Sequence, residues 1–395
     1  MKRTVRSFIF IFLFATLSLT GQSLYHFETI GIEDGLSQSR VMSIVQDTIG
    51  FLWFATQDGL NRYDGRRFKV FRSVRKDSSS LPANYISSLV VSNKGTLWIG
   101  TYTRGLCHFD PLTESFVRWI CPEHKDRYLN ELVIRSLCED TSGCLWMGTT
   151  AGVVTFDPVT KAVRHFRHDP TNDSSISSDG IRAIARDSSG RMWCATRNGV
   201  NRFDPATGQF IRYTHRPNDA RSIASNTVWT VQTDREGTLW CGTADGLSRY
   251  NRTTDDFTTY RNTLTSSPSL TSNNSGVVYE DSHNQLWFGM NDRLHILHKV
   301  TGVIEEVSQN PLVPGSLPSN NVGYIFEDRS GVLWFGFGSY GIAKFDPELL
   351  NFGSVYSIPF PSIKHRCRNE VSATCSKIQR EHFGSQPTAE GSVTG

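Results

Sequence analysis

The chain has 395 residues, with 41 lysines and arginines against 38 aspartates and glutamates, giving a formal net charge of +3. This near balance argues against a general attraction to nucleic acid or to an anionic membrane surface. The 9 tryptophans, 24 phenylalanines and 32 glycines suit many short strands joined by tight turns.

The first 23 residues have the layout of a secretory signal peptide. A basic start is followed by an apolar run from Phe8 to Leu19 and then by small and polar residues from Thr20 to Ser23. The run is about 12 residues long, short of the ~20 that cross a bilayer. We therefore expect cleavage after Thr20 or Ser23 and no membrane span in the mature chain. A retained anchor is the alternative.

A tryptophan recurs about every 47 residues, which indicates an internal repeat. Its seven copies are Trp53, Trp98, Trp146, Trp193, Trp240, Trp287 and Trp334. Six residues before it stands an aspartate, except for Ser92 in the second repeat. Three residues before it stands a glycine, except for Asn284 in the sixth. Two residues after it only glycine or alanine occurs.

Each part of this motif has a local structural meaning. The stretch from Asp234 to Gly237 is typical of a hairpin turn, because aspartate bonds to the backbone that follows it and glycine reaches positive φ at no steric cost. The run from Leu239 to Thr243 is apolar on both faces, so the strand must be covered on both sides. The small residue after the tryptophan lets a neighbouring sheet approach closely.

Each repeat thus predicts four short strands, and seven such sheets bury both faces only by packing around an axis. We expect an all-β fold, a seven-bladed β-propeller of four-stranded antiparallel blades over residues 24–357. Tyr25 to Ile30 resembles a fourth strand that could complete the last blade, with residues 348–357 as the competitor. Residues 358–395 carry no blade pattern and are expected to be a disordered or aberrant tail.

The cysteines do not form a metal motif. No CxxC pair occurs among the eight of them, so a zinc site is not expected. Cys194 and Cys241 each follow a repeat tryptophan, where we expect small core residues. An oxidising compartment would permit a disulfide, but the sequence assigns none.

The repeats resemble those of the two-component regulator propeller family. The resemblance extends over residues 25–350 and rests on Gly35-Leu36-Ser37, on Asp47 through Thr56 and on Asp58 through Asp64. It implies the periplasmic sensor head of a hybrid two-component system that detects oligosaccharides. The kinase and regulator parts that such proteins commonly carry are not in this sequence, so a non-signalling fragment is also considered.

The functional signal lies where the repeats differ. One residue after the apolar start of each inner strand, equivalent positions should ring the axis, and we call these the axial positions. They are Met42, Ser87, Arg135, Arg182, Trp229, Gly276 and Gly323. We predict a pocket with a cationic and aromatic arc and an open, glycine-lined side. The alternative is that these side chains cover the rim of the propeller without binding a ligand.

Arg135, Arg182 and Trp229 come from three successive repeats. Tryptophan can stack on a sugar ring, and arginine can bind a carboxylate or sulfate through two parallel hydrogen bonds. An acidic oligosaccharide would therefore suit this arc.

The loops between second and third strands should open on the same face as the axial positions. They present residues that vary between repeats, as binding loops on a rigid frame do. These are Tyr102, Arg104, Arg197, Asn198, Asp245, Asn291, Arg293 and Tyr340. Ordinary solvent-exposed loops are the alternative.

We expect no catalytic residues, no metal site and no cofactor. Gly336 to Gly341 matches GxGxxG only formally, because it lies between two strands and does not open a helix. A seven-bladed lyase is considered but would need a general base, and no histidine occupies an axial position. A protein-interaction scaffold is the remaining alternative. The partners we expect are an oligosaccharide and no nucleic acid, with a homodimer left open.

Overall fold

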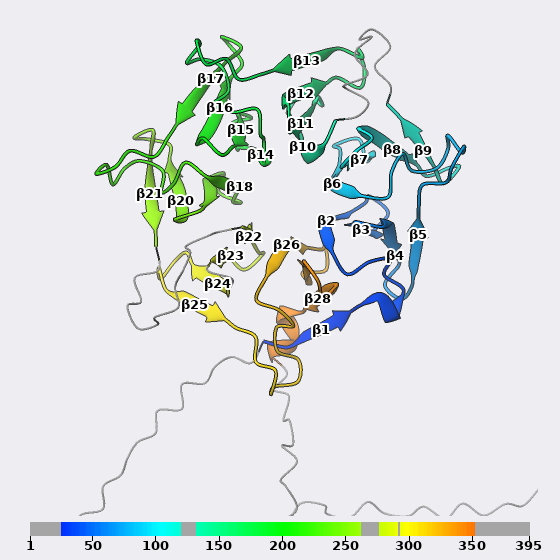
Figure 1. Cartoon of the computed structure of the whole chain (residues 1–395). Helices are drawn as coiled ribbons and strands as arrows, with labels where there is room; N and C mark the ends of the chain where they lie inside the picture. The colour runs from blue at the N-terminus through cyan, green and yellow to red at the C-terminus, as the bar shows by residue number, and fades with distance from the viewer. Residues whose placement is uncertain (1–24, 120–131, 262–275, 291–292, 352–395) are drawn as a thin grey trace, which may run out of the picture. The chain divides into compact units, whose positions relative to one another are not determined.

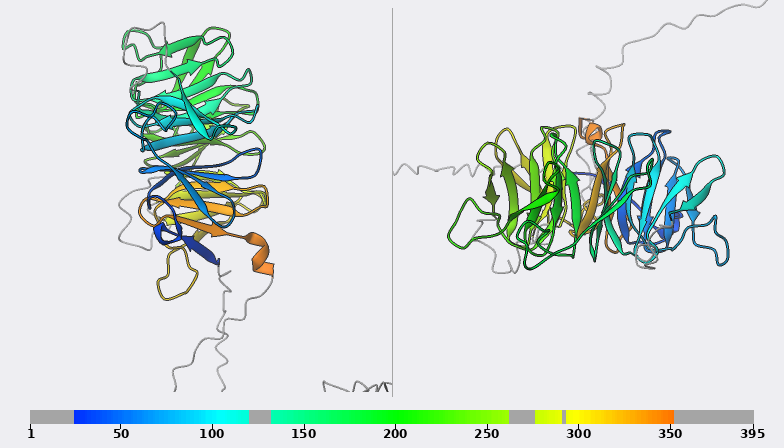
Figure 2. Two further views of the ribbon diagram at one scale, coloured as in Figure 1. Left: turned by 90° about the vertical axis from the view of Figure 1, so that its right-hand side faces the viewer. Right: turned by 90° about the horizontal axis from the view of Figure 1, so that it is seen from above.

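A computed structural model describes residues 25–119, 132–261, 276–290 and 293–351. The predicted signal peptide and tail lie outside these residues. Seven four-stranded antiparallel sheets surround a central axis, as the sequence predicts (Figure 1). The ring they form is much thinner along its axis than across it (Figure 2).

The first three blades each use four consecutive strands, innermost first. Blade one is β2 (Val41–Gln46), β3 (Leu52–Thr56), β4 (Gly59–Tyr63) and β5 (Phe68–Phe71). Blade two is β6 (Ile86–Val91), β7 (Leu97–Thr101), β8 (Leu106–Asp110) and β9 (Ser115–Arg118). Blade three is β10 (Ile134–Glu139), β11 (Leu145–Thr149), β12 (Gly152–Phe156) and β13 (Val163–Phe166).

Blades four to six follow the same order. Blade four is β14 (Ala183–Arg186), β15 (Met192–Ala195), β16 (Val200–Asp204) and β17 (Gln209–Tyr213). Blade five is β18 (Val228–Thr233), β19 (Leu239–Thr243), β20 (Gly246–Asn251) and β21 (Asp256–Tyr260). Blade six is β22 (Val278–Glu280), β23 (Gln285–Met290), β24 (Arg293–His298) and β25 (Ile304–Val307).

Blade seven combines the two ends of the propeller. It contains β26 (Val322–Glu327), β27 (Leu333–Phe337), β28 (Ile342–Phe345) and, outermost, β1 (Phe27–Ile30). β1 pairs antiparallel with β28, with Phe27 opposite Phe345. The N-terminal strand, which we favour over residues 348–357, therefore completes the last blade, and Pro347–Asn351 forms a short 3₁₀ helix.

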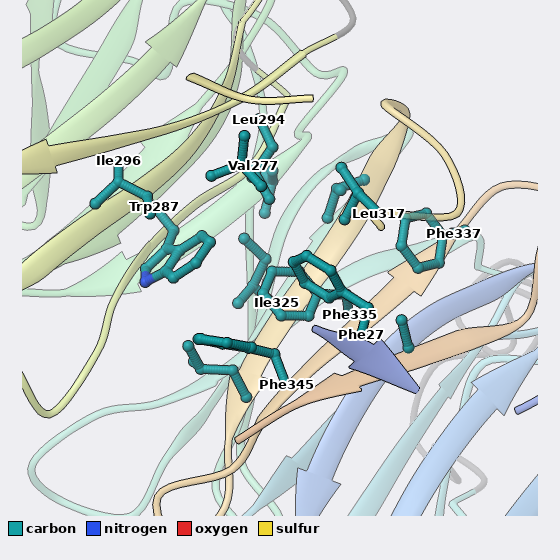
Figure 3. Packing of buried hydrophobic residues seen from close by; sticks show 14 residues of the cluster. Phe27, Val277, Trp287, Leu294, Ile296, Leu317, Ile325, Phe335, Phe337 and Phe345 are labelled. Carbon is teal, nitrogen blue, oxygen red and sulfur yellow. The ribbon is translucent and has the colours of Figure 1, made fainter. Parts of the chain in front are cut away.

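Aromatic side chains fix this closing strand to the ring. Phe27 is 3 % exposed, and its ring centroid lies 5.4 Å from that of Phe335 and 5.5 Å from that of Phe345. These rings join a buried cluster that includes Trp287 of blade six (Figure 3). β1 thus contributes side chains to the core as well as backbone hydrogen bonds.

The repeat aspartate has two roles, of which the sequence indicated only the turn. In blade one, Oδ1 of Asp47 accepts the backbone N–H groups of Ile49, Gly50 and Phe51 at 2.9–3.0 Å. Its Oδ2 accepts the indole N–H of Trp53 at 2.7 Å. Five other blades repeat this indole–carboxylate bond, through Trp146–Asp140, Trp193–Asp187, Trp240–Asp234, Trp287–Asp281 and Trp334–Asp328.

Adjacent blades approach each other at the small residue that follows the tryptophan by two places. A Cβ built on Gly148 of blade three would lie 2.8 Å from Cγ2 of Ile181, which precedes β14. At the equivalent Gly100, a Cβ would lie 2.7 Å from Cγ2 of Ile134 on β10. The expected close approach of neighbouring sheets is therefore confirmed.

Serines on the inner strands bridge the contacts between blades. Leu137 N–H of β10 donates to Ser88 Oγ of β6 at 3.0 Å. Ile184 N–H of β14 donates to Ser136 Oγ of β10 at the same distance. Neighbouring blades are thus joined by polar bonds as well as by apolar packing.

The cysteines in the described part of the chain are free thiols. Cys194 and Cys241 are fully buried core residues, as expected from their position after the tryptophan. Burial raises the pKa of both thiols, so they stay protonated and unreactive.

We predict that Gly148→Ala destabilises the propeller by about 1–3 kcal/mol, because the added methyl group would overlap Ile181. Urea unfolding followed by circular dichroism would measure the loss. Gly338→Ala is the control, since a Cβ there meets no atom within 4 Å. Equal stability of the two variants would contradict the close approach.

We also predict that Trp53→Phe costs about 1–3 kcal/mol more than Trp98→Phe, because only the first leaves a buried carboxylate oxygen without its donor. Blade two has Ser92 in place of the aspartate, and Ser92 Oγ accepts a backbone N–H from Thr96. Trp98→Phe therefore controls for the smaller ring. Thermal unfolding of both variants provides the comparison, and equal losses would mean that the indole bond contributes nothing.

Candidate functional site

The axial positions coincide with β-bulges. In blades one, two, three, five and seven, the register between first and second strands shifts at this residue. A bulge leaves one residue outside the ladder and re-aims its side chain. In blade four, the N–H of Arg182 donates to the carbonyl of Ala195 at 2.9 Å. The axial positions, which were identified from their place in the repeat, are therefore also positions at which the strand pairing is irregular.

The axial side chains of blades one and two take part in the packing between blades. Ser87 is 7 % exposed, and its hydroxyl donates to the carbonyl oxygens of Gly100, at 3.1 Å, and Ile134. Met42 packs against the buried cluster between these blades. Gly276 and Gly323 are exposed and carry no side chain. Only blades three to five retain long polar or aromatic axial side chains.

Arg182 and Trp229, from blades four and five, are in direct contact. The guanidinium carbon of Arg182 lies 3.9 Å from the centroid of the Trp229 ring, a close cation–π arrangement. Burial lowers the pKa of Arg182 to about 10, and the charges of Arg197 and Arg135 add to the shift. Arg182 stays protonated near neutral pH, and it does so beside two other cations.

We call Arg135, Arg182, Arg197 and Trp229 the axial cluster. Its arginines form no ion pair with any carboxylate of the described residues. Arg182 Nε and Trp229 Nε1 are shielded from solvent and have no hydrogen-bond acceptor within the same part of the chain. The cluster therefore combines unbalanced positive charge with unused N–H donors.

The other predicted loop residues divide into two groups. Asp245 pairs with Arg261 at 3.0 Å, and Arg293 pairs with Glu306 at 2.5 Å, so both are engaged within their own blades. Asn198 donates to the carbonyl of Ser177 at 3.3 Å.

The remaining loop residues are Arg104, Tyr340, Tyr102 and Asn291. Arg104 is exposed, and its backbone N–H donates a hydrogen bond to the hydroxyl oxygen of Thr101. Tyr340 is 55 % exposed. Asn291 lies outside the described residues.

Tyr102 belongs to an aromatic pair that sequence reasoning missed. Its ring stacks on Tyr85 with centroids 4.5 Å apart and an angle of 11° between planes. The N–H of Tyr102 also donates to the carbonyl of Tyr85 at 3.0 Å. Tyr85 directly precedes β6, where no other repeat has an aromatic residue. This difference between the repeats is the signal by which the sequence could have identified Tyr85.

Among the described residues, no three His, Cys, Asp or Glu side chains gather in a way that could hold a metal ion. No helix in this part of the chain is long and apolar enough to cross a membrane.

Comparisons with known proteins agree with the repeat. Five segments match the family model for the two-component regulator propeller, at residues 80–103, 128–151, 175–198, 222–245 and 316–339. A 74-residue stretch is 46 % identical to Histidine kinase P4 of Formosa agariphila, covering 18 % of this chain and 5 % of that protein.

Two kinds of solved structure share the fold. The extracellular domain of a protein assigned to the hybrid two-component systems of B. thetaiotaomicron has a TM-score of 0.69 at 24 % identity, over 82 % of this chain and 42 % of its own. A streptogramin B lyase has a TM-score of 0.60 at 16 % identity, over 82 % of this chain and 98 % of its own. The chain thus spans less than half the length of the histidine kinase and of the extracellular domain that it matches.

Proposed function

We infer that this chain, five segments of which match the two-component regulator propeller, is an exported ligand-sensing propeller that binds an oligosaccharide at the axial cluster. The observation that carries this proposal is the contact between Arg182 and Trp229, beside two further arginines that have no counter-ion within the described residues. Structural charges are normally paired, so a cluster of arginines without counter-ions favours a ligand.

The proposed location is the periplasm. The basic and apolar layout of residues 1–23 supports export, and the similar structure from B. thetaiotaomicron is an extracellular domain. In that setting the propeller is the part that meets the ligand. Signalling would require kinase and regulator parts, on the same protein or on a partner.

The residues at the axial positions suit ligand binding better than catalysis. The axial positions hold arginine and tryptophan but no carboxylate or histidine that could act as a general base. The streptogramin B lyase shares the fold, and at 16 % identity its likeness shows the fold alone. A lyase remains the second candidate, and a protein-interaction scaffold is the third.

Calorimetric titration with a panel of neutral and uronic-acid oligosaccharides tests the proposal. We expect Arg182→Ala and Trp229→Ala each to weaken binding about tenfold or more, since a hydrogen bond to a charged group contributes about 1.5–3 kcal/mol. Arg249→Ala, at an exposed position on β20 of blade five, should leave binding unchanged. Binding unaffected by either axial substitution would exclude this site. New unsaturated product would favour the lyase.

A further inference from the structure

Two N–H groups of the axial cluster have no acceptor. Arg182 Nε and Trp229 Nε1 are both out of contact with solvent, and the described residues offer neither of them an oxygen. A buried donor without a partner is costly, and most such groups in native proteins are paired. Because both orphans are donors, the missing partner is an acceptor.

The charges of the cluster define that acceptor further. Burial and the neighbouring Arg197 and Arg135 both act against the positive charge of Arg182. A negatively charged group placed among them would relieve this repulsion, whereas a neutral hydroxyl would not. The groups that combine negative charge with several acceptor oxygens are carboxylate, sulfate and phosphate, and the arginine fork fits all three.

The contact between the two side chains assigns a different role to Trp229. The guanidinium of Arg182 covers one face of the indole ring at 3.9 Å, so a sugar cannot stack on that face. The same contact limits the positions that a long, flexible arginine side chain can adopt. A cation repelled by two neighbours needs such a support if it is to keep its position.

We propose that the axial cluster is an oxyanion subsite in which Arg182, with Arg135 and Arg197, binds the acidic group of the ligand, while Trp229 donates its Nε1–H to that group and also holds the Arg182 guanidinium in place. This subsite rests on the proposed function for its biological ligand. The subsite itself requires only an oxyanion, so small anions can test it without any oligosaccharide.

Glucuronate, inorganic sulfate and inorganic phosphate are the probes, with neutral glucose as the uncharged control. Each is titrated into the full chain by calorimetry, and melting temperatures are recorded in parallel, because a ligand that binds the folded state raises the melting temperature. We expect at least one anion to bind and glucose not to bind. The anion that binds most tightly distinguishes a carboxylated ligand from a sulfated or phosphorylated one.

Substitutions of Arg182 and Trp229 distinguish the contributions of these two residues to anion binding. Arg182→Gln should weaken anion binding about tenfold or more and abolish the anion-dependent rise in melting temperature. Trp229→Phe keeps an aromatic face under the guanidinium but removes the Nε1 donor, so it should weaken anion binding about three- to tenfold. Trp229→Leu removes both and should approach the loss seen for Arg182→Gln. Arg249→Gln is the charge-matched control and should behave like the unsubstituted chain.

Each outcome bears on one proposal or the other. If Arg182→Gln responds to all three anions as the unsubstituted chain does, the subsite is wrong, even if oligosaccharides bind elsewhere. If small anions bind through Arg182 but no oligosaccharide does, the subsite stands and the proposed function fails. If Trp229→Leu binds anions normally, the positioning role of Trp229 is wrong.

Discussion

The contact between one blade and the next is the constraint on which this fold depends. Each sheet is apolar on both faces, and the residue two places after the tryptophan determines how near the next sheet can come. At Gly100 and Gly148 there is no room for a Cβ beside Ile134 and Ile181. The buried tryptophans fill the remaining space, and an aspartate in the turn fixes six of their indole N–H groups. One short motif thus determines how closely the sheets approach, which side chains fill the space between them and how the indole N–H groups are bonded.

That motif explains why the architecture could be predicted from the sequence. Blade number, strand order and the closing role of Tyr25 to Ile30 all follow from turn residues and apolar patterns, which act within one repeat or between neighbours. Interactions that depend on side-chain conformation could not be predicted in the same way. The second role of Asp47, as acceptor for Trp53, requires the indole to turn back toward the hairpin. Nothing in the spacing of the two residues specifies that orientation.

The same limit applies to the candidate site. The axial positions were found by offset, and the structure shows that five of them are bulges. The sequence could not show that the Ser87 hydroxyl donates to Ile134 of the next blade, or that Arg182 lies on Trp229 instead of beside it. Nor could it show that Asp245 and Arg293 form ion pairs within their blades. Long charged side chains have several partners within reach, and the three-dimensional neighbourhood selects among them.

The pairing of β1 with β28 has a consequence for how the propeller forms. Phe27 and Phe345 lie opposite each other although nearly the whole propeller separates them along the chain. Blades one to six can assemble from local segments, but the seventh joins the earliest and latest parts of the domain. Such non-local pairing slows folding, because the entropy of closing a long loop is lost before the contacts form. Until then β1 has an unpaired edge, and Phe27 lacks its contacts with Phe335 and Phe345. The chain is therefore most prone to aggregation just before its ring closes.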